Sequence, residues 1–176
     1  VVIPEYKQPS PQTQENGIKL VSVNIIRGSS EVQDHRINSL SKFNCIQACI
    51  DAHRKGGDEG LMLDPHGYVS TCNSTHFFMI KDKLVYTPFP KACLPGITRQ
   101  TVIDICQSNN IPIIEKDISV TEMYNADEVF STGTMGELAR VEEIDKRKIE
   151  NTGDVLSNLQ NLFRKLTEKD GEKIPF

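Results

Sequence analysis

Three stretches of the chain carry apolar residues at helical spacing, and each predicts a helix that is apolar on one face. The stretches cover residues 39–55, 98–108 and 153–167. The stripe of the first consists of Leu40, Phe43, Ile46 and Ile50. We expect this helix to end at the paired glycines 56 and 57, since glycine commonly follows a helix C-terminus.

Short apolar runs between turn residues predict β-strands. The predicted strands cover residues 18–27, 60–63, 68–71, 76–80, 84–87, 111–119, 127–131 and 138–145. The turn at 64–67 (D-P-H-G) and the turn at 81–83 (K-D-K) each join two of these strands as a hairpin. Hairpins mixed with helices favour an α+β fold over a regular series of β-α-β units. We therefore expect mixed strands around a core, with the three helices packed outside.

The ends of the chain differ in character from its middle. Residues 7–17 are polar and contain two prolines, which is typical of an extended linker. We interpret residues 1–17 as the end of a preceding domain and its linker, and the chain as a piece of a longer protein. Residues 18–168 form the main predicted domain, and 169–176 a loose tail.

Charge and composition narrow the classes of partner. The chain has 20 Lys and Arg against 24 Asp and Glu, a net charge of −4, which argues against a nucleic-acid or membrane-surface binder. No apolar run approaches the roughly 20 residues that a membrane-spanning helix needs. The cysteines are residues 45, 49, 72, 93 and 106. Their odd number and the lack of a C-x-x-C motif favour a reducing compartment, most simply the cytoplasm. Cys45 and Cys49 could share a helix face as a metal or redox pair, but we interpret them as small core residues and predict no metal site.

Two short motifs have the chemistry to bind an anion. L-P-G-I-T-R at 94–99 enters a predicted helix, where free N–H groups and the positive end of the helix dipole favour phosphate. Gly96 permits close backbone approach, and Thr98 adds a hydroxyl. The alternative is that Thr98 simply caps the helix. S-T-G-T at 131–134 follows a predicted strand and could form an anion-binding nest or an ordinary polar turn.

The order and spacing of these motifs resemble the large domain of the class IV aminotransferases, the fold-type IV enzymes that use pyridoxal phosphate. This family includes branched-chain and D-amino acid aminotransferases and aminodeoxychorismate lyase. The matching stretches are D-P-H-G-Y-V-S-T-C-N-S-T-H-F-F at 64–78, K-D-K-L-V-Y-T-P at 81–88, L-P-G-I-T-R at 94–99, A-D-E-V-F at 126–130 and S-T-G-T at 131–134. The resemblance covers roughly residues 18–149 and implies the α+β (mixed α/β) large domain of this fold, with a smaller N-terminal domain ahead of it.

The resemblance also implies cofactor-binding residues. The residues that match Ile97, Thr98 and Thr134 hold the cofactor phosphate, with Gly96 and Gly133 in the same two loops. The family lysine that bonds to the cofactor aldehyde precedes the first helix of the large domain. Without gaps, its position falls on Asn38, which would leave any cofactor bound non-covalently. Lys42, one helical turn further on, is the rival candidate.

A second departure concerns the family acid that pairs with the pyridine nitrogen. Its position falls on Thr71, and a hydroxyl cannot stabilise a positively charged ring nitrogen as a carboxylate does. Three hypotheses follow. The chain belongs to a transaminase or lyase acting on amino and keto acids, to a degenerate relative that binds or regulates, or to a structural subunit. The resemblance further implies a homodimer whose site the neighbouring subunit completes.

Overall fold

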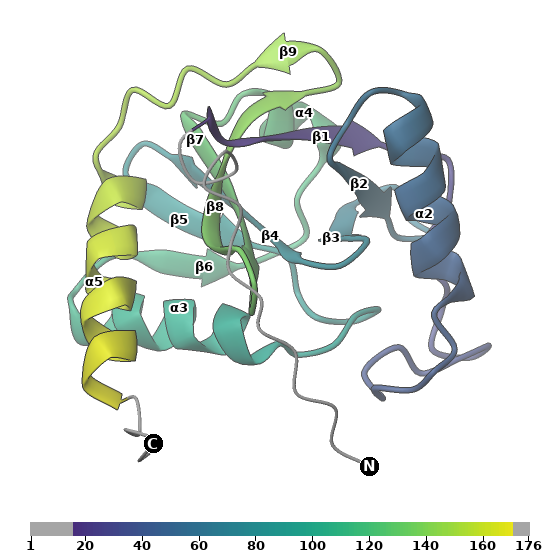
Figure 1. The fold of residues 1–176 in the computed structure, drawn as a ribbon, viewed down its shortest axis with the longest axis horizontal. Coiled ribbons are helices and arrows are strands. Elements are labelled where there is room, and N and C mark those ends of the chain that lie inside the picture. Colours follow the sequence, from purple (N-terminus) through teal and green to yellow (C-terminus); the bar gives the residue numbers. More distant parts are fainter. Residues whose placement is uncertain (1–15, 171–176) are drawn as a thin grey trace, which may run out of the picture.

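The structure, a computed structural model, describes residues 16–170, so the predictions for residues 1–15 and 171–176 lie outside it (Figure 1). The strands are β1 (Ile18–Ser22), β2 (Glu59–Leu63), β3 (Val69–Cys72), β4 (His76–Lys81), β5 (Leu84–Thr87), β6 (Ile113–Glu115), β7 (Glu128–Gly133), β8 (Glu137–Ile144) and β9 (Arg147–Lys148). The helices whose bounds lie within these residues are α2 (Phe43–Arg54), α3 (Ile97–Ser108), α4 (Val120–Tyr124) and α5 (Val155–Asp170).

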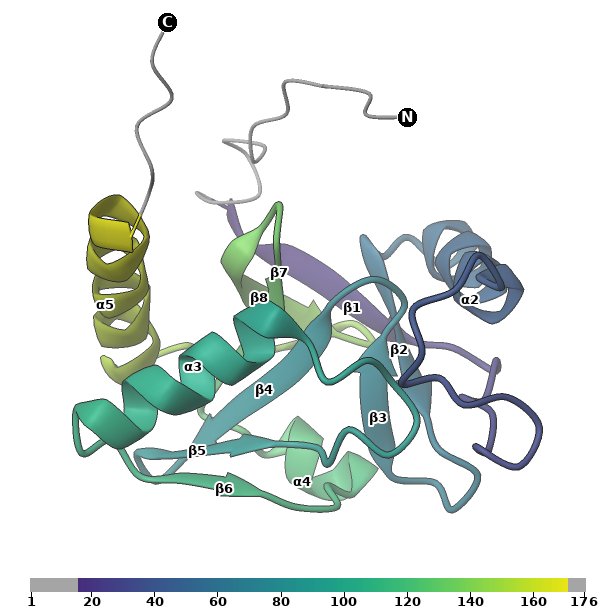
Figure 2. The same ribbon diagram turned by 90° about the horizontal axis from the view of Figure 1, so that it is seen from below.

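One mixed sheet organises this part of the chain. Its strands run in the order β3-β2-β1-β8-β7-β4-β5-β6, and β9 pairs with β8. β1 is parallel to both of its neighbours, and β5 is parallel to β6, while the remaining neighbours are antiparallel. The predicted α+β fold is therefore confirmed. Figures 1 and 2 show α3 and α5 together at one side of the sheet and α2 at the other.

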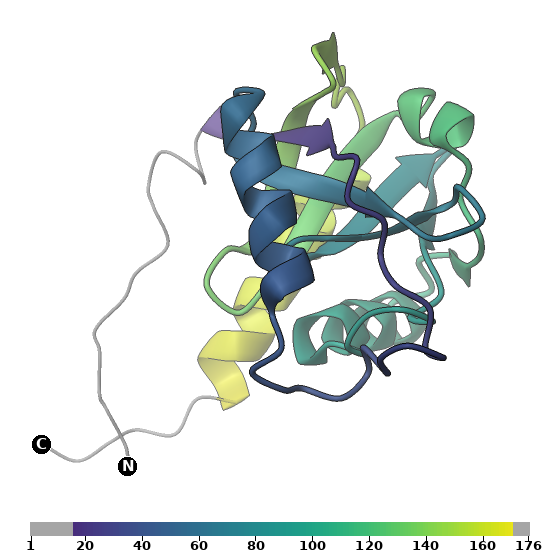
Figure 3. The same ribbon diagram turned by 90° about the vertical axis from the view of Figure 1, so that its right-hand side faces the viewer.

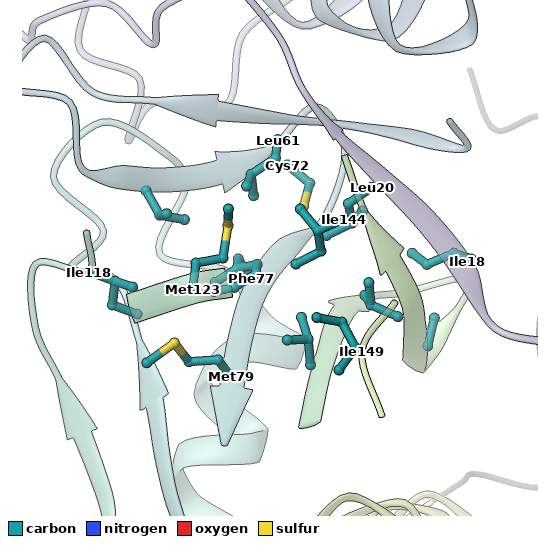
Figure 4. Packing of buried hydrophobic residues seen from close by; sticks show 14 residues of the cluster. Ile18, Leu20, Leu61, Cys72, Phe77, Met79, Ile118, Met123, Ile144 and Ile149 are labelled. Carbon is teal, nitrogen blue, oxygen red and sulfur yellow. The ribbon is translucent and has the colours of Figure 1, made fainter. Parts of the chain in front are cut away.

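Side chains of the central strand β4 alternate between two cores, as the period-2 pattern of a strand requires. Phe77 and Met79 point into the cluster inside the curled sheet (Figure 4). Phe78 and Ile80 point to the other face, where α3 and α5 cover them. There the ring of Phe78 stacks on that of Phe130, with centroids 4.9 Å apart. The odd-numbered residues of β4 thus face the core inside the curled sheet, and the even-numbered ones face α3 and α5.

Both predicted hairpins are present. β2 pairs with β3, and β4 pairs with β5 across a two-residue loop between Lys81 and Leu84. The loop residues Asp82 and Lys83 have φ of 50° and 63°. A two-residue loop with both central φ values positive matches the right-handed twist of the strands that it joins.

The predicted start of the first helix is wrong, and its apolar stripe is exposed. α2 begins at Phe43 instead of residue 39, and Leu40, Phe43, Ile46 and Ile50 are 48–102% exposed. The helix instead turns the small residues Ala48 and Ala52 toward β2. A Cβ added at Gly60 of β2 would lie 2.8 Å from the Ala48 carbonyl oxygen. This close approach leaves room only for small side chains between helix and sheet.

Two strands are shorter than predicted, and the last helix is displaced. β1 ends at Ser22. The next residue is still bonded to β2, because the Val23 N–H donates to the Leu61 carbonyl oxygen at 3.0 Å. β6 covers only 113–115, and Ile118 forms an isolated bridge with Val69. α5 starts at Val155, where a buried carboxylate 27 residues earlier accepts its first free N–H groups. That acceptor is Glu128, 3.3 Å from the Val155 nitrogen and 3.2 Å from the Leu156 nitrogen.

Candidate functional site

A pocket of about 400 Å³ lies between the start of α2, the β3–β4 turn and the loop that leads into α3. Three of the residues singled out from the sequence have side chains in or next to it. Lys42 and Thr71 belong to its lining, and Asn38 lies next to Lys42. α2 stands at the edge of the molecule, in front in Figure 3. The pocket borders the exposed apolar side of this helix, because Ile46 belongs to its lining.

The two predicted anion-binding loops meet at the start of β4. A Cβ added at Gly96 would lie 2.3 Å from the His76 ring, and one at Gly133 would lie 3.0 Å from the Thr75 side chain. His76 is also the cross-strand partner of Thr132 in β7. The loops at 94–99 and 131–134 thus lie against two successive residues, Thr75 and His76, both of which line the pocket.

His76 anchors the loop that enters α3. Its Nε2 lies 2.8 Å from the Leu94 carbonyl oxygen, so we assign the ring proton to Nε2, which donates to that oxygen. Burial lowers the pKa of His76, which favours the neutral ring. Its pairing with Thr132, inside the second anion motif, comes from the pairing of β4 with β7, which a single sequence does not reveal.

The start of α3 has backbone donors and no side-chain cap. Its N-cap is Gly96, with φ 73° and ψ 117°, and no side chain makes a capping bond there. The alternative that Thr98 caps the helix is therefore wrong. Ile97 is 89% exposed, and Thr98 is half-buried. The first N–H groups of the helix remain available for an anion, because helix N-termini have no intrahelical acceptors for them.

Thr132 adds a hydroxyl that the sequence did not single out. Its side chain is fully buried, and its Oγ1 has no hydrogen-bond partner among the residues that the structure describes. Strand alternation places it on the same face of β7 as Phe130, which α3 covers. A buried hydroxyl without a partner costs about 1–3 kcal/mol, so such a group calls for an explanation. A bound anion that accepts from this hydroxyl provides one.

Asn38 and Lys42 form a hydrogen-bonded pair. The Lys42 Nζ donates to the Asn38 Oδ1 at 2.9 Å. Lys42 is the N-cap residue of α2 and lines the pocket, whereas Asn38 is outside the lining. The amine of Lys42 therefore lies directly beside the side chain that occupies the gap-free family lysine position.

Thr71 is buried in the pocket wall, and its hydroxyl donates to the Thr75 carbonyl oxygen at 2.8 Å. Its proton is therefore used within the β3–β4 turn. Beside it, burial raises the pKa of the Cys93 thiol. The wall at this position presents a hydroxyl oxygen and a protonated thiol where the family acid would stand.

A half-buried carboxylate that the sequence did not single out holds the β3–β4 turn. Glu59 accepts from the hydroxyls of Ser74 and Thr75, both of which line the pocket. The Asn73 Oδ1 accepts from the Gly60 N–H at 2.6 Å and ties the same turn to β2. Burial raises the pKa of Glu59. Hydrogen bonds with Glu59 and Gly60 of β2 therefore hold this turn in place.

Within residues 16–170, no group of His, Cys, Asp and Glu side chains is arranged to hold a metal ion. Cys45, Cys49, Cys72 and Cys93 all line the pocket as free thiols. The interpretation of Cys45 and Cys49 as buried core residues is wrong, because both are half-buried on the pocket side of α2, whereas Cys72 and Cys93 are buried. None of the helices in the described part of the chain is long and apolar enough to cross a membrane.

Comparison with known proteins defines the class. Residues 1–144 match the family model for amino-transferase class IV, so the chain belongs to this family. It is 41% identical over 177 residues to the branched-chain-amino-acid aminotransferase-like protein 1 of Arabidopsis thaliana, and the match covers 99% of this chain.

Solved structures share the fold. The branched-chain aminotransferase of Thermoproteus uzoniensis, crystallised with norvaline, is 29% identical and has a TM-score of 0.87 over 97% of this chain. The pyridoxal-phosphate form of the branched-chain amino acid aminotransferase of Thermobaculum terrenum is 25% identical, with a TM-score of 0.85 over 93% of this chain. The chain spans only 32% of the Arabidopsis relative and about half of the two crystallised chains, at 56% and 55%.

Proposed function

We propose that this chain is the pyridoxal-phosphate-binding part of a class IV aminotransferase that acts on amino and keto acids. The observation that carries the proposal is the meeting of the two anion loops around a buried, unpartnered hydroxyl. In this proposal the phosphate lies between the start of α3 and the end of β7. The N–H groups of Ile97 and Thr98 and the hydroxyls of Thr132 and Thr134 hold it. A crystallised relative in its pyridoxal-phosphate form supports the choice of cofactor.

Bound pyridoxal phosphate supplies an aldehyde and a ring that accepts electrons. We infer that Lys42 is the residue that bonds to this aldehyde. Among the described lysines, it is the one that lines the pocket, and its Nζ reaches the Asn38 side chain. Asn38 then orients the amine through its Oδ1. The alternative is a degenerate relative that binds the cofactor non-covalently. It follows if the gap-free alignment, which puts Asn38 at the family lysine position, is the right one.

Replacing Thr132 by Val tests the phosphate site. Without ligand, the T132V chain should gain stability, because an unsatisfied buried hydroxyl is replaced by a methyl of similar shape. With pyridoxal phosphate, the affinity should fall by about tenfold or more, since a hydrogen bond to a charged group is worth roughly 1.5–3 kcal/mol. Urea unfolding and equilibrium dialysis measure the two effects.

Thr121→Val is the matched control, since Thr121 is exposed in α4 and away from both loops. It should leave the affinity for pyridoxal phosphate unchanged. Equal affinities for the parent, T132V and T121V would show that the phosphate does not use this hydroxyl. Failure of the parent itself to bind pyridoxal phosphate at millimolar concentration would contradict the proposed function.

We further propose a homodimer that uses the exposed apolar face of α2. The face consists of Phe43, Ile46 and Ile50 of α2, together with Ile37 and Leu40 in the segment before it. Contiguous apolar surface on a folded chain marks an interaction site. Ile46 belongs both to this face and to the pocket lining, so a second copy on this face would also cover the pocket. The free cysteines are in keeping with a cytoplasmic location for such an enzyme.

The dimer proposal predicts a concentration-dependent mass in sedimentation equilibrium. Phe43→Glu should shift the chain to monomer, because it places a charge in the centre of an apolar contact. Phe89→Glu is the control, since Phe89 is 41% exposed but lies outside this face. A parent chain that stays monomeric at every concentration, or a monomerising effect of both variants alike, would count against this interface.

A further inference from the structure

Arg27 is a buried cation in the pocket wall that the proposed function does not use. Its side chain is only 7% exposed, although it lines the pocket. Taking a guanidinium out of water is costly unless an opposite charge or a full set of hydrogen bonds compensates it. The groups around Arg27 therefore decide whether the fold alone accounts for it.

The contacts of Arg27 leave part of the guanidinium without a partner. Its Nε donates to the Ala92 carbonyl oxygen at 2.6 Å. Its Nη1 donates to the Asn44 Oδ1 at 3.3 Å and lies 2.9 Å from the Cys45 Sγ. Within residues 16–170, no carboxylate pairs with Arg27, and Nη2 has no hydrogen-bond acceptor. A guanidinium has five N–H donors, so two of them remain for a ligand in the pocket.

The charges around the pocket have one sign. Arg27 and Lys42 belong to the lining, and no Asp or Glu does. The nearby Glu59 is outside the lining, and its carboxylate accepts from the hydroxyls of Ser74 and Thr75. The first turn of α2, which carries Cys45, contains no acidic residue, so its positive dipole end adds to the field. This wall therefore favours an anion.

We propose that Arg27 binds the carboxylate of a small amino or keto acid that enters the pocket. The planar fork of a guanidinium matches a carboxylate, which can accept two parallel N–H bonds. This site is separate from the phosphate site, which lies at the start of α3 and the end of β7. The proposal rests on the proposed function for the identity of the acid, but the binding step itself needs only Arg27 and the pocket.

Isothermal titration calorimetry with 4-methyl-2-oxopentanoate tests the site directly. The parent should bind this keto acid and should not bind the corresponding amide, which has the same shape without the charge. Arg27→Met should weaken binding by about tenfold or more, the effect of losing hydrogen bonds to a charged group. Arg27→Lys should give an intermediate loss, because lysine keeps the charge but not the fork.

Arg36→Met is the matched control, since Arg36 is exposed and pairs with Asp34 outside the pocket. It should bind the keto acid like the parent. Because Arg27 also holds the Ala92 carbonyl, circular dichroism must show that R27M is folded. If it is not, R27K and the amide carry the test. Equal affinity for acid and amide, or equal affinity of the parent and the folded Arg27 variants, would overturn the proposal.

Pyridoxal phosphate binding by the same proteins separates the two proposals. R27M should still bind the cofactor phosphate, and T132V should still bind the keto acid. Cofactor binding without keto acid binding would remove the role of Arg27 and leave the proposed function intact. Keto acid binding without cofactor binding would contradict the proposed function and leave the role of Arg27 intact.

Discussion

A Gly96→Ala variant is expected to lose about 2–4 kcal/mol of unfolding free energy and most of its affinity for pyridoxal phosphate. Gly96 has φ 73° and ψ 117°, a conformation open to glycine and strained for any other residue. The added methyl would also lie 2.3 Å from the His76 ring, which cannot withdraw without breaking its bond to the Leu94 oxygen. Urea unfolding measures the stability, and equilibrium dialysis measures the affinity.

Gly67→Ala separates the two causes, because Gly67 has φ 84° but nothing within 4 Å of an added Cβ. It should show the cost of backbone strain alone. The double variant G96A/H76A should recover part of the loss, since it removes the ring that the methyl contacts. If G96A and G67A lose the same stability, and G96A binds the cofactor normally, the tight packing of the phosphate loop on His76 has no functional role.

Glu59→Ala is expected to lower the unfolding free energy by about 1–3 kcal/mol and to weaken ligand binding in the pocket. The variant removes the acceptor of the Ser74 and Thr75 hydroxyls and so frees a turn that lines the pocket. Glu59→Gln should lose less, because the amide keeps an oxygen acceptor. Glu31→Ala, at an exposed position, should change neither quantity.

The Glu59 carboxyl also predicts a pH dependence. Burial raises its pKa above the usual value of 4.5, so the folded chain binds this proton more tightly than the unfolded chain does. Its contribution to stability is complete below pH 4.5 and is lost as the pH rises through the folded pKa. The parent should therefore lose stability relative to E59Q as the pH rises above 4.5. Parallel stability curves for the two proteins would show that Glu59 does not titrate in this way.

The helix α2 shows where periodicity succeeds and where it stops. The spacing of Phe43, Ile46 and Ile50 located a helix correctly, because apolar residues three and four apart share one face. It did not show what that face contacts. The helix packs on β2 with its Ala48 side because Gly60 has no side chain and so allows this close approach. Which face of a helix is buried depends on the surface that it packs against, and the apolar pattern of one segment does not describe that surface.

The candidate site divides in the same way. The glycine and hydroxyl motifs at 96–98 and 131–134 could be found from the sequence, because local chemistry marks a helix start and a strand end. Thr132, Glu59 and Arg27 could not be selected as site residues from the sequence. Thr132 stands out because its buried hydroxyl has no partner among the described residues, and Arg27 because no described carboxylate pairs with it. Glu59 stands out because it accepts from two hydroxyls of the pocket wall. These depend on pairing between strands and loops that are distant in sequence, such as β4 with β7. A buried Arg or Glu can be recognised only after the fold is known.

The most direct test of cofactor binding at Lys42 is to saturate the protein with pyridoxal phosphate at low excess, reduce it with borohydride and map the modified peptide by mass spectrometry. We expect one stoichiometric adduct on Lys42, lost in Lys42→Arg and retained in Asn38→Ala. Tight binding of the cofactor with no adduct would favour the degenerate relative, in which Asn38 leaves the cofactor without a covalent bond. An adduct that forms equally on exposed lysines, or that survives in K42R, would contradict the role assigned to Lys42.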